Sequence, residues 1–183
     1  MTPDVELDRD SSEQRPTDAV RDLVHRSFRL MEVWDDEEAA RLIHPESVNH
    51  EAVAEPPAAR GRGPQAYRAT YDWLHGAYAD VRWTVHDVVA EGDLAVARVT
   101  MTGRHVGPFT VFSPDGVLDQ VFAPTGRTFE VTQMHMYRLR DGAIADHWAN
   151  RDDLGQARQL GWVPPTPAFL LRGALLKRRL RRG

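Results

Sequence analysis

The segment HWANRDDLGQARQLG, residues 147–161, joins the end of an expected strand to the start of an expected helix, and Asp152 lies at the junction. Aspartate is a preferred N-cap residue, because its side-chain oxygen accepts a hydrogen bond from a free backbone N–H of the first helical turn. A partly buried carboxylate can also carry protons, because burial raises its pKa from about 3.9 toward neutrality. The sequence leaves both roles open for Asp152, and Asp153 could provide the cap instead.

His135 is the second candidate for proton chemistry. Alternate side chains of a strand share a face, so His135 lies on the same face as Gln133 and Tyr137 in FEVTQMHMYRL. A mixed polar and apolar face suits a pocket wall, and imidazole can both donate hydrogen bonds and exchange protons. The other face carries Met134 and Met136, so the pattern leaves open which face points inward. A hydrogen-bonded structural histidine is the alternative interpretation.

The sequence offers little for metal, thiol or phosphate chemistry. It has no cysteine, which excludes disulfides, thiol nucleophiles and cysteine-ligated zinc. Its eight histidines show neither His-x-His nor the i, i+4 spacing of a helical zinc site, and HExxH does not occur. Glycine-rich phosphate loops and the G-x-S-x-G nucleophile elbow are also missing. We therefore expect no metal ligands.

Length and composition indicate one soluble globular domain. A chain of 183 residues with 42% hydrophobic residues is ordinary for such a domain, and no apolar run approaches the roughly 20 residues that span a bilayer. Residues 1–15 are polar and acidic, which is typical of a disordered arm rather than of a signal peptide. The simplest expectation is a cytoplasmic protein.

The charge is distributed unevenly along the chain. Residues 167–183 hold six basic residues and no acid, so the remainder has 17 basic and 27 acidic residues, a net charge of −10. A body this acidic is a poor general nucleic-acid binder, and we expect no nucleic-acid partner. Only the basic, leucine-rich tail, residues 164–183, could meet a polyanion.

Hydrophobic periodicity divides the chain into helices followed by strands. Helical spacing is found over residues 16–35, over 35–47 with a stop at Pro45, and over 63–78. Strand-like stretches and tight turns then follow over residues 81–93, 94–107, 128–142 and 143–150, before a last helix over 152–161. Helices first and antiparallel strands afterwards predict an α+β fold in a single domain, residues 16–163.

Several fragments together resemble the SnoaL-like polyketide cyclase family, which has the nuclear-transport-factor-two-like or cystatin-like cone. The fragments are VNHEA, VHDVVAEGDLAVARVTMTGRHVG, PTGR, YRLRDGAIADHW and the closing D-x-x-G-x-x-x-Q-L-G, in an order that spans about Ala19 to Gly161. The resemblance implies N-terminal helices packed on a curved antiparallel sheet that encloses a pocket. The same fold serves several reactions, so the fold alone does not fix the chemistry.

The resemblance also implies an activity. Well-studied members close a polyketide ring by intramolecular aldol condensation without a cofactor, and one Asp of a Trp-x-x-x-Asp-x-x-Gly pattern acts as acid and base. That residue corresponds to Asp152 here, and His135 is expected to assist it. The substrate would be a small hydrophobic carbonyl compound. The residues expected to bind it are Asn49, His50, His105, Gln133, Tyr137 and Trp148.

Three other functions compete with a cyclase or isomerase. A non-catalytic ligand-binding or assembly protein and an oxygen-using hydroxylase both occur on this fold. An epoxide hydrolase is less consistent, because Thr100 stands where that reaction would need an Asp two residues after Arg98. The segment 108–124 is longer than is usual in the family and is expected to fold over the pocket mouth.

The sequence also allows predictions about the oligomeric state and about the C-terminal tail. Family cones commonly pair through the open face of the sheet, and both faces of LAVARVTM carry apolar residues, so we expect a homodimer. The tail is only partly amphipathic as a helix. We expect it to pack on the acidic body, with at most weak membrane contact.

Overall fold

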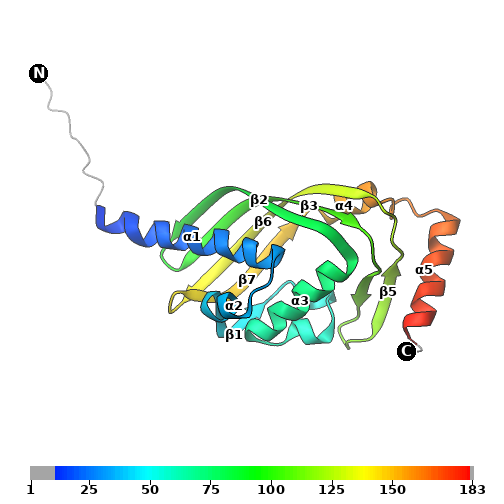
Figure 1. Cartoon of the computed structure of the whole chain (residues 1–183), viewed down its shortest axis with the longest axis horizontal. Coiled ribbons are helices and arrows are strands. Elements are labelled where there is room, and N and C mark those ends of the chain that lie inside the picture. The colour runs from blue at the N-terminus through cyan, green and yellow to red at the C-terminus, as the bar shows by residue number, and fades with distance from the viewer. Residues whose placement is uncertain (1–10, 182–183) are drawn as a thin grey trace, which may run out of the picture.

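The computed structural model describes residues 11–181 and shows helices packed against one face of a strongly curved sheet (Figure 1). The α-helices are α1 (Ser11–Glu32), α2 (Asp36–Leu42), α3 (Gly63–Ala77), α4 (Asp153–Leu160) and α5 (Pro167–Leu180). Two 3-10 turns, η1 (Ala52–Ala54) and η2 (Pro57–Arg60), precede α3. Within the described residues, no helix combines the length and the apolar character needed to cross a membrane.

The main sheet has five strands in the order β1-β7-β6-β3-β2. Its strands are β1 (Ile43–Asn49), β2 (Tyr78–Glu91), β3 (Leu94–His105), β6 (Thr128–Arg140) and β7 (Ala143–Arg151). The strands β4 (Phe109–Phe112) and β5 (Leu118–Phe122) form a separate hairpin. The α+β cone expected from the sequence is confirmed.

The alternation of β6 settles which of its faces points inward. Phe129, Val131 and Tyr137 are buried together with Gln133 and His135 on the concave side. The methionines between them are partly exposed on the convex side. The face that carries His135 therefore belongs to the interior of the cone.

Two apolar clusters occupy the interior of the cone. One joins α1 and α2 to the sheet through residues such as Val24, Phe28 and Val99, and the other surrounds Tyr78 and Trp162. Both clusters contribute residues to one cavity that lies between them. The interior is therefore not filled throughout, and the space that remains can admit a ligand.

Two predictions from the sequence need correction. The sheet is mixed, because β1 runs parallel to β7, and the stretch around Pro45 forms this edge strand instead of simply ending a helix. Proline is tolerated there because an edge strand leaves one side without ladder bonds, and the register shifts between Ile43 and Val48. The first helix begins at Ser11, so residues 11–15 of the predicted disordered arm are helical. Residues 1–10 lie outside the described residues.

The basic tail folds as α5 and lies against β5 (Figure 1). Phe169 packs on the cluster around Trp162, Lys177 contacts the backbone oxygen of Asp119, and Arg181 donates to the oxygen of Leu118 at 2.8 Å. These contacts agree with the expectation that the tail packs on the body. The packed side takes only part of the apolar surface, and several leucines remain more than half exposed. They are Leu170, Leu171 and Leu175.

Candidate functional site

A cavity of about 380 Å³ opens between the concave face of the sheet, α1 and α3. This volume falls within the range of small-molecule sites, which are mostly apolar with a few placed polar groups. The polar residues that line it are Ser27, Asn49, Glu51, Glu55, Thr70, Gln120, Gln133, His135, His147, Arg151, Asp153 and Gln156. Most of the remaining lining is aliphatic or aromatic.

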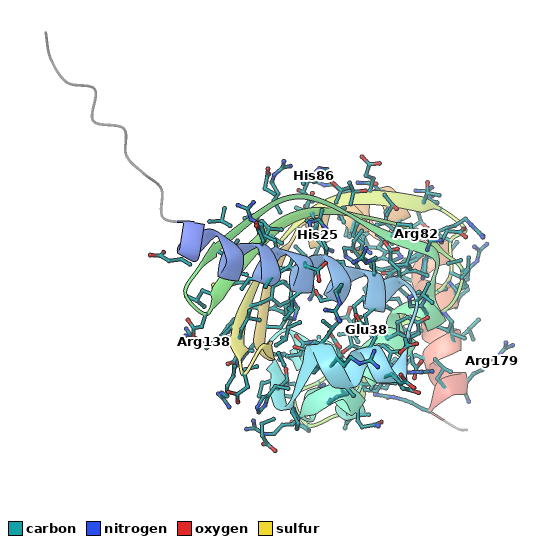
Figure 2. The ribbon with its side chains drawn as sticks, turned by 60° about the vertical axis from the view of Figure 1, so that its left-hand side comes forward. His25, Glu38, Arg82, His86, Arg138 and Arg179 are labelled. Carbon is teal, nitrogen blue, oxygen red and sulfur yellow. The ribbon has the colours of Figure 1, made fainter. Side chains whose placement is uncertain are left out.

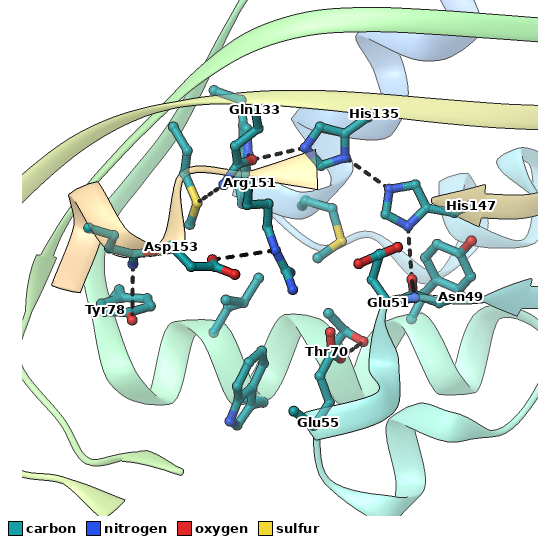
Figure 3. Close-up of a pocket in the computed structure, with 18 of the residues that line it drawn as sticks. Asn49, Glu51, Glu55, Thr70, Tyr78, Gln133, His135, His147, Arg151 and Asp153 are labelled. Carbon is teal, nitrogen blue, oxygen red and sulfur yellow. Dashed lines mark hydrogen bonds and ion pairs between the residues drawn. The ribbon is translucent and has the colours of Figure 1, made fainter. Parts of the chain in front are cut away.

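A chain of four polar side chains runs along one wall of the cavity (Figure 3). His135 Nε2 lies 2.9 Å from Gln133 Oε1, and His135 Nδ1 lies 2.9 Å from His147 Nε2. His147 Nδ1 then lies 2.9 Å from Asn49 Oδ1. Two imidazoles on neighbouring strands are therefore held between two amide groups.

This row of hydrogen-bonded side chains has fewer hydrogens than contacts. Both amides present oxygen to the imidazoles, because Asn49 Oδ1 also accepts from the Glu51 N–H at 3.2 Å and Gln133 Oε1 also accepts from the Trp83 indole at 3.3 Å. Three contacts between four groups need three hydrogens, and two neutral imidazoles supply only two. The chain thus has room for one additional proton.

Electrostatics keeps that proton away in the free protein. Burial, followed by the neighbouring His147 and by Arg151, lowers the pKa of His135 well below its usual 6.5. Burial, followed by Arg151, lowers the pKa of His147 to about 3. The pair is therefore neutral at physiological pH, and proton uptake requires a compensating negative charge nearby.

Glu55 is a second proton-handling group, on the wall formed by η1 and α3. Its side chain is buried, and the Thr70 hydroxyl donates a hydrogen bond to Oε2 at 2.5 Å. Burial raises the pKa of Glu55, because the charged carboxylate loses its hydration. Burial thus favours the protonated form of this carboxyl, which is the form that can donate a proton to a ligand.

Arg151 ends β7 and projects into the cavity between these two walls (Figure 3). Its Nε lies 3.7 Å from Oδ1 of Asp153, which is beyond hydrogen-bonding distance. The guanidinium lies close enough to the histidine pair and to Glu55 to affect the pKa of each. A fixed positive charge therefore lies among the groups that can move protons.

An aromatic wall closes the cavity on the side of the β4–β5 hairpin. Phe109 and Phe122 from the hairpin pack with Trp162, and the ring centroids of Phe122 and Trp162 are 4.3 Å apart. The indole of Trp73 donates to the Thr110 backbone oxygen at 2.9 Å, which ties the hairpin to α3. The segment 108–124 thus contributes directly to the cavity, where a flat ring can stack.

The structure brings four of the predicted site residues together at the cavity and leaves four others outside its lining. Asn49, Gln133, His135 and Tyr137 line the cavity. The other four are His50, His105, Trp148 and Asp152.

The convex face of the sheet and the second apolar cluster hold three of the outlying residues. On the convex side the rings of His50 and Trp148 stack at 4.5 Å, and His50 contacts Asp146 at 2.8 Å. His105 is fully buried beside Trp162, with its Nδ1 3.3 Å from the Thr125 hydroxyl. These three residues lie away from the polar groups of the cavity.

Asp152 occupies the capping position. Its carboxylate accepts a hydrogen bond from the Gly155 N–H at 2.8 Å, and its side chain is exposed. The geometry therefore shows the cap, one of the two roles that the sequence left open, and does not bring Asp152 together with His135. The neighbouring carboxylate that lines the cavity is Asp153.

One β-bulge explains both the outlying residues of β7 and the residues that sequence reasoning missed. A regular hairpin across the Asp141-Gly142 turn would pair Tyr137 with Asp146 and turn Trp148 inward. The register instead shifts by one residue between Arg138 and Leu139, so that Tyr137 pairs with His147. Side chains that face the cavity from β7 therefore include His147 and Arg151, which the alternation alone places outside.

The third missed residue, Glu55, lies in a segment read as a loop, VAEPPAARGRGP. A carboxylate between prolines and alanines gives no periodic signal, so its burial follows only from the tertiary structure. The consecutive buried residues Ile144 and Ala145 are the mark of the bulge, but two small or apolar neighbours are not diagnostic in sequence.

Comparisons with known proteins agree with the fold and with one family. A model described as SnoaL-like polyketide cyclase matches residues 16–160. Aklanonic acid methyl ester cyclase DnrD of Streptomyces peucetius is 33% identical over 147 residues, which cover 80% of this chain and 93% of that protein.

Solved structures give the same picture. TsrD from Streptomyces laurentii is 31% identical with a TM-score of 0.63, and the match covers 79% of this chain and 96% of that one. IdmH from Streptomyces antibioticus, a candidate polyketide cyclase, is 30% identical with a TM-score of 0.58, and the match covers 77% of this chain and 97% of that one.

Proposed function

The chain belongs to the SnoaL-like polyketide cyclase family, and on that premise we propose that it closes a ring by intramolecular aldol addition in a hydrophobic, polyketide-derived carbonyl compound. The observation that carries the proposal is the His135–His147 pair, held between two amide oxygens at the wall of an apolar cavity. The proposed reaction uses no cofactor.

In the proposed first step the histidine pair accepts a proton from carbon next to a carbonyl. The pair has one hydrogen too few for its three contacts, so the incoming proton completes the chain of hydrogen bonds. Its positive charge is matched by the enolate that forms at the same moment. Proton transfer is therefore coupled to substrate ionisation, and the histidine pair stays neutral when no substrate is bound.

The enolate carbon then attacks the second carbonyl carbon of the same molecule, and the new carbon–carbon bond leaves an alkoxide. Glu55 is proposed to give this alkoxide its proton, because burial raises its pKa and so favours the protonated form. The proton held by the histidine pair returns to Glu55 through the cavity or solvent. The product has the same atoms as the substrate, so no oxidant or reductant is needed.

Asp152 has no part in this scheme. Its carboxylate caps α4, is exposed and does not line the cavity in which the substrate would lie. His135, which the sequence predicted as an assistant to Asp152, belongs in this scheme to the proton-accepting pair with His147.

The relative named above as an aklanonic acid methyl ester cyclase gives the first substrate to test. The purified protein would be incubated with aklanonic acid methyl ester, the products separated by chiral chromatography, and their masses measured by mass spectrometry. We expect a ring-closed product of unchanged mass, with activity reduced by about 10²–10⁴-fold in His135→Asn. A product heavier by one oxygen atom would instead indicate a hydroxylase. Tight binding without any turnover of such substrates would indicate a binding protein.

We also infer that the protein works as a homodimer that pairs through the convex face of the sheet. Partly exposed Met134 and Met136 lie on this face beside Trp148. Membrane contact through α5 is proposed to be weak at most, since Phe169 and Lys177 already bind the body of the protein.

A further inference from the structure

Arg151 is the one guanidinium that lines the cavity in the part of the chain that the structure describes. The bulge in β7 turns it inward, and about a third of its side chain, 31%, remains accessible. By contrast, the labelled Arg138 and Arg179 point away from the body of the protein (Figure 2). The inward position needs an explanation, because a charge in an apolar cavity loses hydration.

The ion pair of Arg151 does not supply that explanation. Asp153 is its sole carboxylate partner within 4.0 Å among the described side chains, residues 18–181, and the distance of 3.7 Å is too long for a hydrogen bond. The Asp153 side chain is 73% exposed, so solvent screens this contact. A guanidinium has five N–H donors in a planar fork, and this geometry leaves them available to a ligand.

The other acidic groups of the cavity do not neutralise Arg151 either. Glu51 lines the cavity, but no ion pair between it and Arg151 is formed in the described residues. Glu55 accepts a hydrogen bond from Thr70. Burial raises the pKa of Glu55 in spite of the nearby guanidinium, so its charged form is disfavoured. The cavity therefore keeps a positive charge that is only partly compensated.

An uncompensated guanidinium suits an anionic ligand, and the aromatic wall indicates what kind of molecule would carry the negative charge. The rings of Phe109, Phe122 and Trp162 pack together along the side of the hairpin. Flat apolar surfaces of this kind suit stacking against a fused ring system. The cavity thus combines a site for a planar skeleton with one fixed cation.

We propose that Arg151 anchors an ionised oxygen of the substrate, either a carboxylate or an acidic enol or phenol, carried on a flat apolar ring system. The proposal deepens the proposed function and rests on it, because it takes this cavity as the substrate site. The bidentate geometry of a guanidinium suits both kinds of oxygen anion. For an esterified substrate, which lacks the carboxylate charge, the anion at Arg151 is the enol or phenol oxygen.

A matched pair of unreactive probes tests the carboxylate. An anthraquinone monocarboxylic acid and its methyl ester share one skeleton and differ in charge, and their binding at neutral pH can be measured by titration calorimetry. We expect the wild-type protein to bind the acid more tightly than the ester by about tenfold or more, as for a hydrogen bond to a charged group. Arg151→Gln should remove this preference, and Arg151→Lys should keep part of it.

Alizarin, a dihydroxyanthraquinone, tests the enol or phenol, because its visible absorption reports ionisation. We expect the bound dye to ionise at lower pH in the wild-type protein than in Arg151→Gln. The matched control is Arg138→Gln, which removes an outward guanidinium paired with Asp93 and should leave both results unchanged.

The two arms identify the source of the anion. If the protein prefers the acid to the ester but leaves the ionisation of alizarin unshifted, the anion is a carboxylate. If bound alizarin ionises at lower pH, the anion is an enol or phenol. Equal binding of acid and ester together with an unshifted alizarin titration in the wild-type protein would overturn the proposal without use of any variant. Neither probe reacts, so this result is independent of whether the protein shows cyclase turnover.

Discussion

Two histidine sites lie on opposite faces of β7 and differ in nearly every physical respect. On the concave face, His147 contacts His135 and Asn49, and burial lowers its pKa to about 3. On the convex face, His50 contacts the carboxylate of Asp146 at 2.8 Å and is 38% exposed. Asp146 and His147 are neighbours in sequence, so two adjacent residues of β7 contribute to these two different environments.

The comparison shows that residue type does not determine the chemistry. The convex site has the histidine–carboxylate pair that looks catalytic in a sequence, but solvent screens it and it does not line the cavity. In the concave site of the described structure no carboxylate contacts the imidazoles, which burial keeps neutral and which line the cavity. Burial and the hydrogen-bond count therefore distinguish the sites better than the pairing of residues.

Moving the end of β7 by one residue should break this comparison most strongly. A second alanine inserted after Ala145, with the one-residue bulge kept, pairs Tyr137 with Asp146 in place of His147, which turns Asp146 and Trp148 inward and His147 outward. Because a charge would then be buried without a partner, we expect destabilisation by roughly 3 kcal/mol or more and complete loss of ring closure. Urea unfolding and the cyclisation assay measure both effects. Replacement of Ala145 by Gly, which keeps the register, is the control, and a fully active insertion variant would refute the role given to the register of β7.

Sequence reasoning succeeded where regular periodicity determines the structure. The long alternation of β6 put Gln133, His135 and Tyr137 on one face, and the Asp141-Gly142 turn, with φ of 53° and 76°, has the conformation that a tight hairpin needs. The order of helices and strands then predicted an α+β fold, and the resemblance to the SnoaL-like family implied the cone. These features are local, so the sequence alone reveals them.

It failed where one irregular residue changes everything downstream. A single extra residue in β7 exchanges the two faces of the strand, and therefore Trp148 was assigned to the pocket while His147 and Arg151 were overlooked. The parallel pairing of β1 with β7 has the same character, because it depends on a partner almost a hundred residues away. Neither a bulge nor a distant pairing leaves a periodic trace in the sequence.

Matched histidine variants sharpen the comparison between the two faces. His147→Asn keeps a hydrogen-bonding side chain but cannot accept a proton, so we expect ring closure to slow by about 10²–10⁴-fold. His50→Asn removes an imidazole that is 38% exposed on the convex face, and it should change the rate less than about threefold. Both rates come from one steady-state assay. A larger loss in His50→Asn than in His147→Asn would place the chemistry on the convex face.

The convex face has a different expected role, in assembly. Met134→Glu with Met136→Glu places two charges on this face, which should separate the proposed homodimer because buried like charges repel. Light scattering should give twice the chain mass of 20.7 kDa for the wild-type protein and the single chain mass for the variant. The control is Val33→Glu, an exposed site between α1 and α2. A wild-type monomer at micromolar concentration would reject this interface.

Acid should destabilise the protein through the concave site. The pKa of His147 is about 3 in the folded chain and about 6.5 when unfolded, so the unfolded state binds the proton first. Stability is therefore complete above about pH 6.5 and falls as the pH decreases, by up to about 1.4 kcal/mol per pH unit for each such histidine. In His147→Asn the slope of unfolding free energy between about pH 6.5 and 5 should be shallower than in the wild-type protein. Equal slopes would mean that His147 is solvated and can charge freely.

The smallest effect is expected at Asp152, where capping and catalysis make opposite predictions. The carboxylate accepts from the Gly155 N–H, and asparagine caps a helix about as well as aspartate, whereas alanine does not. Asp152→Ala should therefore lose about 1 kcal/mol and melt roughly 2–4 °C lower, and Asp152→Asn should melt like the wild-type protein. Both should keep ring-closure rates within about threefold, because the exposed carboxylate does not line the cavity. A proton carrier would behave differently, since asparagine keeps the shape and the hydrogen bond but cannot ionise. A stable Asp152→Asn protein that has lost activity would return Asp152 to the chemistry and leave the histidine pair as its assistant.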